Sequence, residues 1–111
     1  MLDSIKQKLE KLNPIESTSL KKAGVFIGIL YHDDYILNPE VIFTQRSAKL
    51  STHSGEVSFP GGKWEEQDKN LYETALRESN EEINLNKEDV VLAGSLNYLV
   101  SKHKIEVNPY V

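Results

Sequence analysis

The stretch of sequence that decides the fold is PGGKWEEQDKNLYETALRESNEEIN, residues 60–84. It opens on a pair of glycines, and apolar side chains then recur at helical spacing from Leu71 to Ile83. This pattern predicts a helix that has Asp68 as its N-cap and runs to about Ile83. Asn84 comes next, and asparagine tolerates the left-handed conformation that often closes a helix.

Three carboxylates share one face of this predicted helix. Glu78, Glu81 and Glu82 stand at positions i, i+3 and i+4, which lie one above the other on a helix. Like charges at this spacing destabilise a helix, and the macrodipole disfavours them near its C-terminus. A hard divalent cation such as Mg²⁺ binds carboxylate oxygens and would offset that cost. From the helix alone, a metal site and a solvated acidic face both remain open.

Two glycines precede the predicted helix, and their spacing from the residues that follow is informative. Gly61 and Gly62 allow the backbone to approach a phosphate or a metal closely. Five residues separate Gly62 from Asp68, and eight more lead to Arg77. This arrangement, with the acids that follow it, resembles the Nudix box, a motif of Gly, Glu, Arg-Glu, Glu-Glu and Gly at fixed spacing.

The chain departs from the Nudix box at four points. Asp68 replaces the usual Glu, and the gap before Arg77 is one residue longer. Ser79 stands where an apolar residue is expected, and Asn84 stands where Gly is expected. None of these changes removes an acid of the expected metal site, and Asn also reaches positive φ.

A second motif lies upstream and resembles one branch of the Nudix superfamily, the coenzyme A pyrophosphatases. That branch has an Arg-Ser pair, then a His-x-Gly-x-x-x-Phe-Pro-Gly-Gly run, then the box. The resemblance covers about residues 23–111 and is densest over 44–85. The matching segments here are Thr44–Ser47 with Leu50, His53–Gly62, Thr74–Glu78 and Val107–Val111.

The resemblance implies hydrolysis of coenzyme A at its pyrophosphate, giving 3′,5′-ADP and 4′-phosphopantetheine. It implies Mg²⁺ or Mn²⁺ as cofactor, and a pairing of Arg77 with Asp68 or Glu81. The implied metal ligands are Glu78, Glu81, Glu82 and the Gly61 carbonyl. The implied catalytic residues are Glu78, Glu81, Glu82 and Arg77, and the implied substrate contacts are Arg46, Ser47, His53, Gly61, Gly62 and Lys63.

Three other interpretations remain open at this point. The chain could be a Nudix hydrolase of ADP-ribose, a dinucleotide or a nucleoside triphosphate, because the box is common to all of them. It could be a Nudix-like module that binds nucleotide or metal without turnover. It could also be a small α/β domain with an acidic helix and no site.

Composition excludes several classes of protein. The 111 residues fit a single domain, 1–111, and the net charge of −4 is unlike that of a nucleic-acid binder. The absence of cysteine excludes disulfides, thiol catalysis and zinc-thiolate sites. No apolar run is long enough to cross a membrane, and no signal peptide opens the chain. We therefore expect a cytoplasmic protein that acts on a small molecule, with no nucleic-acid or membrane partner.

The remaining patterns predict an α/β layered domain. A helix and lead-in should occupy residues 1–20, and the Nudix core residues 23–111. The resemblance implies a Nudix-type α/β/α sandwich with a mixed β-sheet. The predicted helix spans 2–12 and ends at Asn13-Pro14, and the predicted strands span 23–31, 41–44, 57–59 (stopped by 60–62), 90–96 and 105–111.

The C-terminal end is expected to leave the core incomplete. Coenzyme A pyrophosphatases continue beyond the point that Val111 matches, with more strands and a closing helix. The apolar run over residues 105–111 would then leave an unpaired strand edge. Such an edge favours a homodimer formed by strand addition or swapping.

Overall fold

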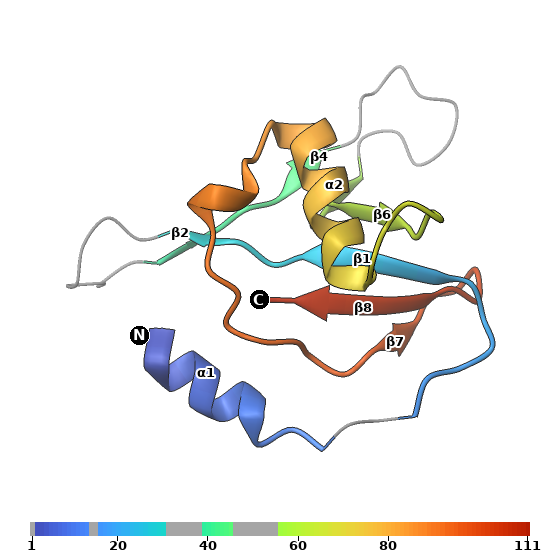
Figure 1. The fold of residues 1–111 in the computed structure, drawn as a ribbon, viewed down its shortest axis with the longest axis horizontal. Coiled ribbons are helices and arrows are strands. Elements are labelled where there is room, and N and C mark those ends of the chain that lie inside the picture. Colours follow the sequence, from blue (N-terminus) through green and yellow to red (C-terminus); the bar gives the residue numbers. More distant parts are fainter. Residues whose placement is uncertain (1, 14–15, 31–38, 46–55) are drawn as a thin grey trace.

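A mixed four-stranded sheet forms the centre of the molecule (Figure 1). The computed structural model describes residues 2–13, 16–30, 39–45 and 56–111. The strand order across the sheet is β6 (Gly61–Lys63), β1 (Lys22–Phe26), β8 (Glu106–Tyr110) and β7 (Leu99–Val100). Strand β1 is antiparallel to β6 and parallel to β8, and β8 is antiparallel to β7. The predicted α/β class and mixed sheet are confirmed.

Helix α2 (Leu71–Ile83) packs against one face of this sheet, over β1 and β6. Its closest approach is at Gly24, where an added Cβ would collide with the carbonyl oxygen of Leu71. Glycine is needed there because the helix backbone lies directly on the strand. Ala75 and Leu76 complete the contact as buried apolar side chains.

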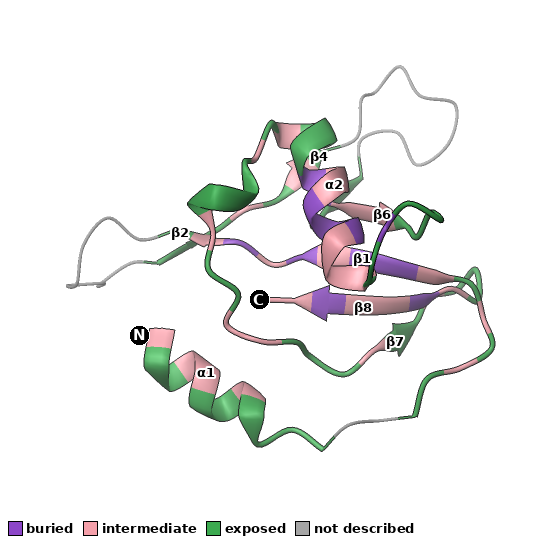
Figure 2. Ribbon diagram, in the orientation of Figure 1, coloured by how far each residue is buried: buried purple, intermediate pink, exposed green. Residues whose placement is uncertain are grey.

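The buried residues gather where α2 crosses β1 and along β8 (Figure 2). Among the described residues the apolar core is small, so polar side chains make up much of the interior. The buried apolar side chains are Ala23, Phe26, Pro60, Ala75, Leu76 and Pro109, and the buried polar or charged ones are Asp68, Thr74, Ser79 and Glu106. Each buried polar group needs a hydrogen-bond partner to offset its desolvation.

Helix α1 (Leu2–Glu10) stands apart from α2 and touches the segment that leads to β7 (Figure 1). The side chain of Leu9 lies against Gly94, where an added Cβ would be 3.0 Å from it. The predicted N-terminal helix is thus confirmed, with its end at Glu10. Neither helix among the described residues is long and apolar enough to span a bilayer.

The predicted strand over 23–31 divides in two. After β1, the backbone leaves the main sheet and β2 (Ile29–Leu30) pairs with β3 (Glu40–Val41). The change of partner follows Phe26 and Ile27, whose N–H groups donate to Pro60 and Tyr110. The strand predicted over 41–44 also divides, because β4 (Thr44–Gln45) pairs with β5 (Val57–Ser58) instead.

The strand predicted over 57–59 is confirmed as β5 and the strand predicted over 105–111 as β8, but two other predictions were wrong. The Pro60–Gly62 segment does not simply stop a strand, because Gly61–Lys63 is itself β6 and pairs with β1. Residues 90–96 form no strand beyond one bridge, Ser95 to Tyr110. Their backbone hydrogen bonds do not follow the alternating pattern of a strand, because the N–H groups of Ala93 and Gly94 both donate to the Val111 carbonyl. A short 3₁₀ turn (Lys87–Asp89) and β7 were not predicted.

A buried carboxylate joins β8 to the segment before β1. Glu106 is almost fully buried, and its Oε1 accepts from the Thr18 N–H at 2.7 Å and the Thr18 hydroxyl at 2.8 Å. Its other oxygen accepts from Asn108 Nδ2 at 3.0 Å. Burial alone would raise the pKa of Glu106, but the hydrogen bonds from Asn108, Thr18 and Ser17 outweigh it and lower the pKa to about 2.

Candidate functional site

The predicted acid face of α2 lies beside β6. The Glu78 side chain rests on Gly62, where an added Cβ would collide with the carboxyl group. Gly62 pairs with Gly24 in the sheet, and Gly24 in turn lies under α2. Two glycines therefore allow strand, helix and carboxylate to come together with no intervening side chain.

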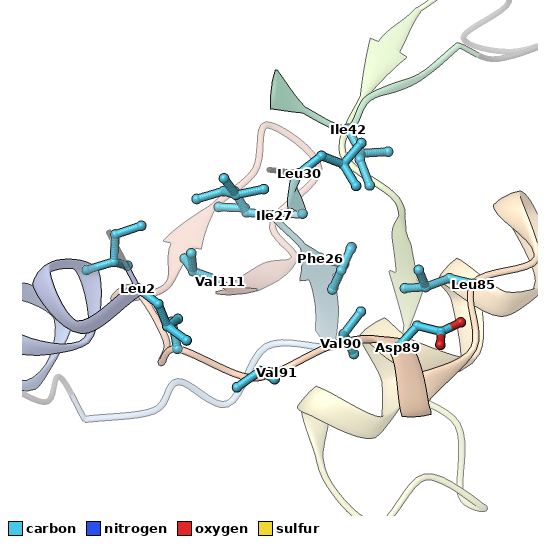
Figure 3. A pocket seen from close by; sticks show the side chains of 14 residues that line it. Leu2, Phe26, Ile27, Leu30, Ile42, Leu85, Asp89, Val90, Val91 and Val111 are labelled. Atoms are coloured by element: carbon cyan, nitrogen blue, oxygen red, sulfur yellow. The ribbon is translucent and has the colours of Figure 1, made fainter. Parts of the chain in front are cut away.

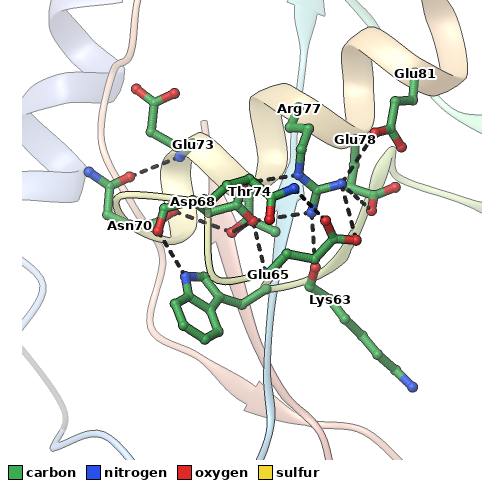
Figure 4. A network of polar contacts seen from close by, with 11 residues as sticks. Lys63, Glu65, Asp68, Asn70, Glu73, Thr74, Arg77, Glu78 and Glu81 are labelled. Carbon is green, nitrogen blue, oxygen red and sulfur yellow. Dashed lines mark hydrogen bonds and ion pairs between the residues drawn. The ribbon is translucent and has the colours of Figure 1, made fainter.

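Arg77 is the centre of the polar network at this place (Figure 4). Its Nε donates to Asp68 Oδ1 at 2.9 Å and its Nη2 donates to Asp68 Oδ2 at 3.1 Å, which is a bidentate pair. Nη2 also donates to the Lys63 carbonyl at 3.1 Å. Nη1 donates to Glu78 Oε1 at 3.0 Å and to Glu81 Oε1 at 3.3 Å. The Arg77 guanidinium therefore links Asp68 to two acids of the acid face, Glu78 and Glu81.

Asp68 is a deeply buried partner for this arginine. Besides Arg77, it accepts from the Thr74 hydroxyl at 2.9 Å and the Glu65 N–H at 3.0 Å. The hydrogen bond from Arg77 lowers the pKa of Asp68, against the opposing effect of burial. The same bond raises the pKa of Arg77. Asp68 thus pairs with Arg77 despite the longer gap before the arginine.

Asp68 is not the N-cap of α2, and that prediction was wrong. The cap is Asn70, whose side chain accepts from the Glu73 N–H at 2.8 Å. The extra residue in the gap before Arg77 separates the two tasks, because Asn70 can close the helix while Asp68 turns toward Arg77. The C-terminal prediction is confirmed, since Asn84 adopts the left-handed conformation with φ 57° and ψ 34°.

The three acids of the predicted metal site are placed differently from one another. Glu78 is the most covered, with 19% of its side chain exposed, whereas that of Glu81 is 58% exposed. Glu82 is exposed near the end of the helix. Among the residues that the structure describes, no three acidic or histidine side chains are gathered tightly enough to hold a metal ion.

Glu78 and Glu81 nevertheless converge on one positively charged atom, Arg77 Nη1. Glu65 Oε1 lies 3.8 Å from the same nitrogen. Carboxylate oxygens that meet around a cationic centre are the ligand type that Mg²⁺ and Mn²⁺ take. The donor chemistry therefore fits a hard divalent ion, and Glu78, Glu81 and Glu82 remain the predicted ligands.

The other predicted site residues are only partly placed. Arg46, Ser47 and His53 lie outside the described residues. The Lys63 side chain extends away from the acids, while its carbonyl accepts from Arg77 (Figure 4). Gly61 pairs with Val25 in the sheet, and its carbonyl stays a predicted metal ligand.

Sequence reasoning missed two residues that support Arg77. Thr74 is fully buried and orients Asp68, and Glu65 contributes both its N–H and its carboxylate. The signal for Thr74 was its position one helical turn before Arg77, which places both on one side of α2. Glu65 lies in the loop between box positions, where spacing alone gives no signal.

An apolar hollow of about 350 Å³ lies apart from the acid face (Figure 3). Side chains from α1, from the chain after β1 and from the segment before β7 meet there around Val111. Among the described residues that line it, Asp89 is the charged one. None of the predicted metal ligands borders this hollow, so the acid face is a separate site.

Comparisons with known proteins bear on the fold and on the family. The family model described as NUDIX domain matches residues 31–109. A solved structure, a MutT/nudix family protein from Enterococcus faecalis, superposes with a TM-score of 0.62 at 15% identity. The superposition covers 99% of this chain and 42% of the Enterococcus faecalis chain. The fold is therefore of the same type.

Curated relatives are more similar in sequence. "Nudix hydrolase 15, mitochondrial" of Arabidopsis thaliana is 50% identical over 82% of this chain and 31% of its own. "Uncharacterized Nudix hydrolase NudL" of Yersinia enterocolitica is 44% identical over 86% of this chain and 47% of its own. "Peroxisomal coenzyme A diphosphatase ndx-8" of Caenorhabditis elegans is 35% identical over 98% of this chain and 47% of its own. The chain thus spans about a third to a half of the length of these relatives.

Proposed function

The chain belongs to the NUDIX family, and on that premise we propose that it is a metal-dependent hydrolase of pyrophosphate linkages with coenzyme A as substrate. The expected products are 3′,5′-ADP and 4′-phosphopantetheine. The observation that carries the proposal is the position of Arg77 Nη1 between Glu78 and Glu81, with Glu78 resting on Gly62.

The residues of the acid face have distinct tasks in this proposal. Bound Mg²⁺ or Mn²⁺ neutralises pyrophosphate charge and supplies an activated water. Glu78, Glu81 and Glu82 supply carboxylate oxygens for that ion, and Arg77 holds the first two in place. Asp68 in turn fixes Arg77 through two hydrogen bonds, so the guanidinium cannot turn freely.

Gly62 has no side chain, and the Glu78 carboxyl group occupies the space that one would take. Glycine at this position therefore allows the carboxylate to lie directly against the strand, where any larger residue would keep it away. The extended backbone of β6 and the side chain of Glu78 together define one wall of the proposed site.

Two observations support coenzyme A among the possible substrates. The segment over residues 44–62 resembles the motif of coenzyme A pyrophosphatases. A relative that is named a coenzyme A diphosphatase matches 98% of this chain. ADP-ribose, a dinucleotide or a nucleoside triphosphate is the alternative, because the box itself does not distinguish them. The cytoplasmic location and the homodimer stay predictions from the sequence.

The test is a product assay on coenzyme A with Mg²⁺ and with Mn²⁺, applied to Glu78→Gln, Glu81→Gln and Glu82→Gln. We expect each variant to lose more than about a hundredfold in rate, since even outer-shell partners of a metal contribute 10- to 100-fold in affinity. Glu73→Gln is the matched control, because it makes the same change on α2 away from the acid face. Melting curves on the same samples separate lost function from lost fold.

Metal binding can be followed without turnover. Trp64 is the only tryptophan, and its indole N–H donates to the Asp68 carbonyl at 3.1 Å, so its fluorescence should respond when the Arg77 network changes. Three variants with wild-type rates would refute the metal-site assignment. Faster cleavage of ADP-ribose than of coenzyme A would show that coenzyme A is not the preferred substrate. Mn²⁺ binding with no cleavage would indicate a binding module.

A further inference from the structure

Two phenylalanine rings are stacked close to the acid face. Phe43 and Phe59 have ring centroids 4.7 Å apart and planes inclined by 26°. The pairing of β4 with β5 sets Thr44 opposite Ser58, and the next step of that register sets these two rings opposite each other. The stack is therefore fixed by the backbone of two strands.

Phe43 is the more exposed ring of this stack. It is 54% exposed, although it is a large apolar side chain, and among the described residues its ring stacks on Phe59. Phe59 is more covered. An exposed aromatic face on a fixed partner ring is a surface on which a flat π-system can stack, because every nucleobase has such a face.

The stack is also at a defined distance from the acid face. Two residues, Pro60 and Gly61, separate Phe59 from Gly62, so the two Cα atoms lie at most about 11 Å apart. Pro60, between them, is fixed by a hydrogen bond from the Phe26 N–H to its carbonyl at 2.8 Å. The Glu78 carboxylate rests on Gly62. A base on the rings and phosphates at the acid face can thus belong to one nucleotide, whose ribose spans the gap.

We infer that Phe43, supported by Phe59, is the stacking surface for the purine base of the nucleotide substrate. The inference rests on the proposed function, since it requires a nucleotide at the acid face. It assigns to Phe43 a role in affinity and specificity and none in bond cleavage. Substrates that lack a base should bind without its help.

The experiment measures ADP binding by calorimetry with Mg²⁺ present, in wild type, Phe43→Ala and Phe43→Tyr. We expect Phe43→Ala to bind ADP about 10- to 100-fold more weakly, and Phe43→Tyr to bind like wild type. The affinity for inorganic pyrophosphate, which has no base, should be the same in all three. Leu99→Ala is the control, because Leu99 is 55% exposed on β7, at the β7 edge of the main sheet.

Several results would overturn the inference. The first two are an ADP affinity of Phe43→Ala equal to that of wild type, and a wild type that does not bind ADP. The other two are equal losses of ADP and pyrophosphate affinity in Phe43→Ala, and a Phe43→Tyr variant that binds ADP as weakly as Phe43→Ala. Melting curves show whether Phe43→Ala is folded, and Phe59→Leu tests the same stack from its other ring. Coenzyme A cleavage by wild type with ADP binding independent of Phe43 would refute this inference alone. ADP binding through Phe43 without any cleavage would refute the proposed function alone.

Discussion

Asp68 and Glu106 are both buried carboxylates, and the structure satisfies them by different means. Asp68 faces a full positive charge, because Arg77 binds both of its oxygens. Glu106 is bound chiefly by neutral donors from Ser17, Thr18 and Asn108, and Lys22 Nζ is 4.0 Å away. One site joins a helix to a loop, and the other joins β8 to the segment before β1.

The difference shows which of the two networks can serve a reaction. The Asp68 network continues through Arg77 to Glu78 and Glu81, so a change at Asp68 reaches the acid face. The donors that bind Glu106 come instead from β8 and from the segment before β1. We therefore expect damage at Asp68 or Arg77 to lower both stability and turnover, and damage at Glu106 to lower stability alone.

The largest effect should come from breaking the ionic network. Arg77→Met leaves the Asp68 charge buried without its partner, and such a loss typically costs about 3–5 kcal/mol. We expect a lower melting temperature, together with loss of coenzyme A cleavage. The double variant Arg77→Met with Asp68→Asn should recover part of the stability and none of the activity, because a neutral amide needs no counter-charge. Additive losses in the double variant would show that the two residues are not coupled.

A smaller effect is expected from Glu106→Gln. Its amide NH₂ would face donors that now meet a carboxylate, so the variant should lose about 2–3 kcal/mol of unfolding free energy. Denaturant unfolding at pH 7 measures this loss, with the exposed Glu10→Gln as control. Turnover per folded molecule should equal that of wild type. A loss of turnover in a folded Glu106→Gln sample would contradict the separation of the two networks.

The same glutamate gives a prediction for acid. Its pKa in the folded protein is about 2, below its ordinary 4.5, so its contribution to stability is fully present above pH 4.5. That contribution, about 3 kcal/mol, should be lost as the pH falls from about 4.5 toward 2. Unfolding free energies across this range should therefore decline less steeply in Glu106→Gln than in wild type. Parallel pH profiles would show that Glu106 does not carry this dependence.

The smallest effect is expected at Asn70, the N-cap of α2. Asn70→Ala removes the acceptor for the Glu73 N–H, and losing such a cap costs about 1 kcal/mol. We expect a small fall in melting temperature and an unchanged rate of coenzyme A cleavage. Asn70→Asp, which restores an acceptor, should be as stable as wild type. A rate that falls with Asn70→Ala would place the cap within the functional network.

The sequence predicted the parts of the molecule whose rules are local. Helical spacing located α2 and placed Glu78, Glu81 and Glu82 on one face. The resemblance to the box paired Arg77 with Asp68 or Glu81, and the structure shows both pairings. The left-handed Asn84 followed from the intrinsic preference of asparagine. Each of these depends on residues within one or two helical turns, so the pattern is visible in the chain itself.

The parts that were missed depend on distant partners. Gly61–Lys63 is a strand because β1 pairs with it, although glycine has a low strand preference. Residues 90–96 have apolar strand-like character, yet their N–H groups bond irregularly with residues 109 and 111. Glu106 looks like an ordinary surface acid until Thr18, 88 positions earlier, is placed against it. None of these pairings can be predicted from the spacing of neighbouring residues in the sequence.

The parallel pairing of β1 with β8 has a consequence for how the chain folds. Loop-closure entropy opposes contacts between distant parts of a chain, so such pairings form late and slow the overall rate. Strand β6 and helix α2 lie much nearer to β1 along the chain and contact it extensively. We therefore expect a nucleus of β1, β6 and α2 to assemble first, which brings the acid face together before β8 docks. In a nascent chain, the edge of β1 that β8 covers stays open until β8 has been synthesised.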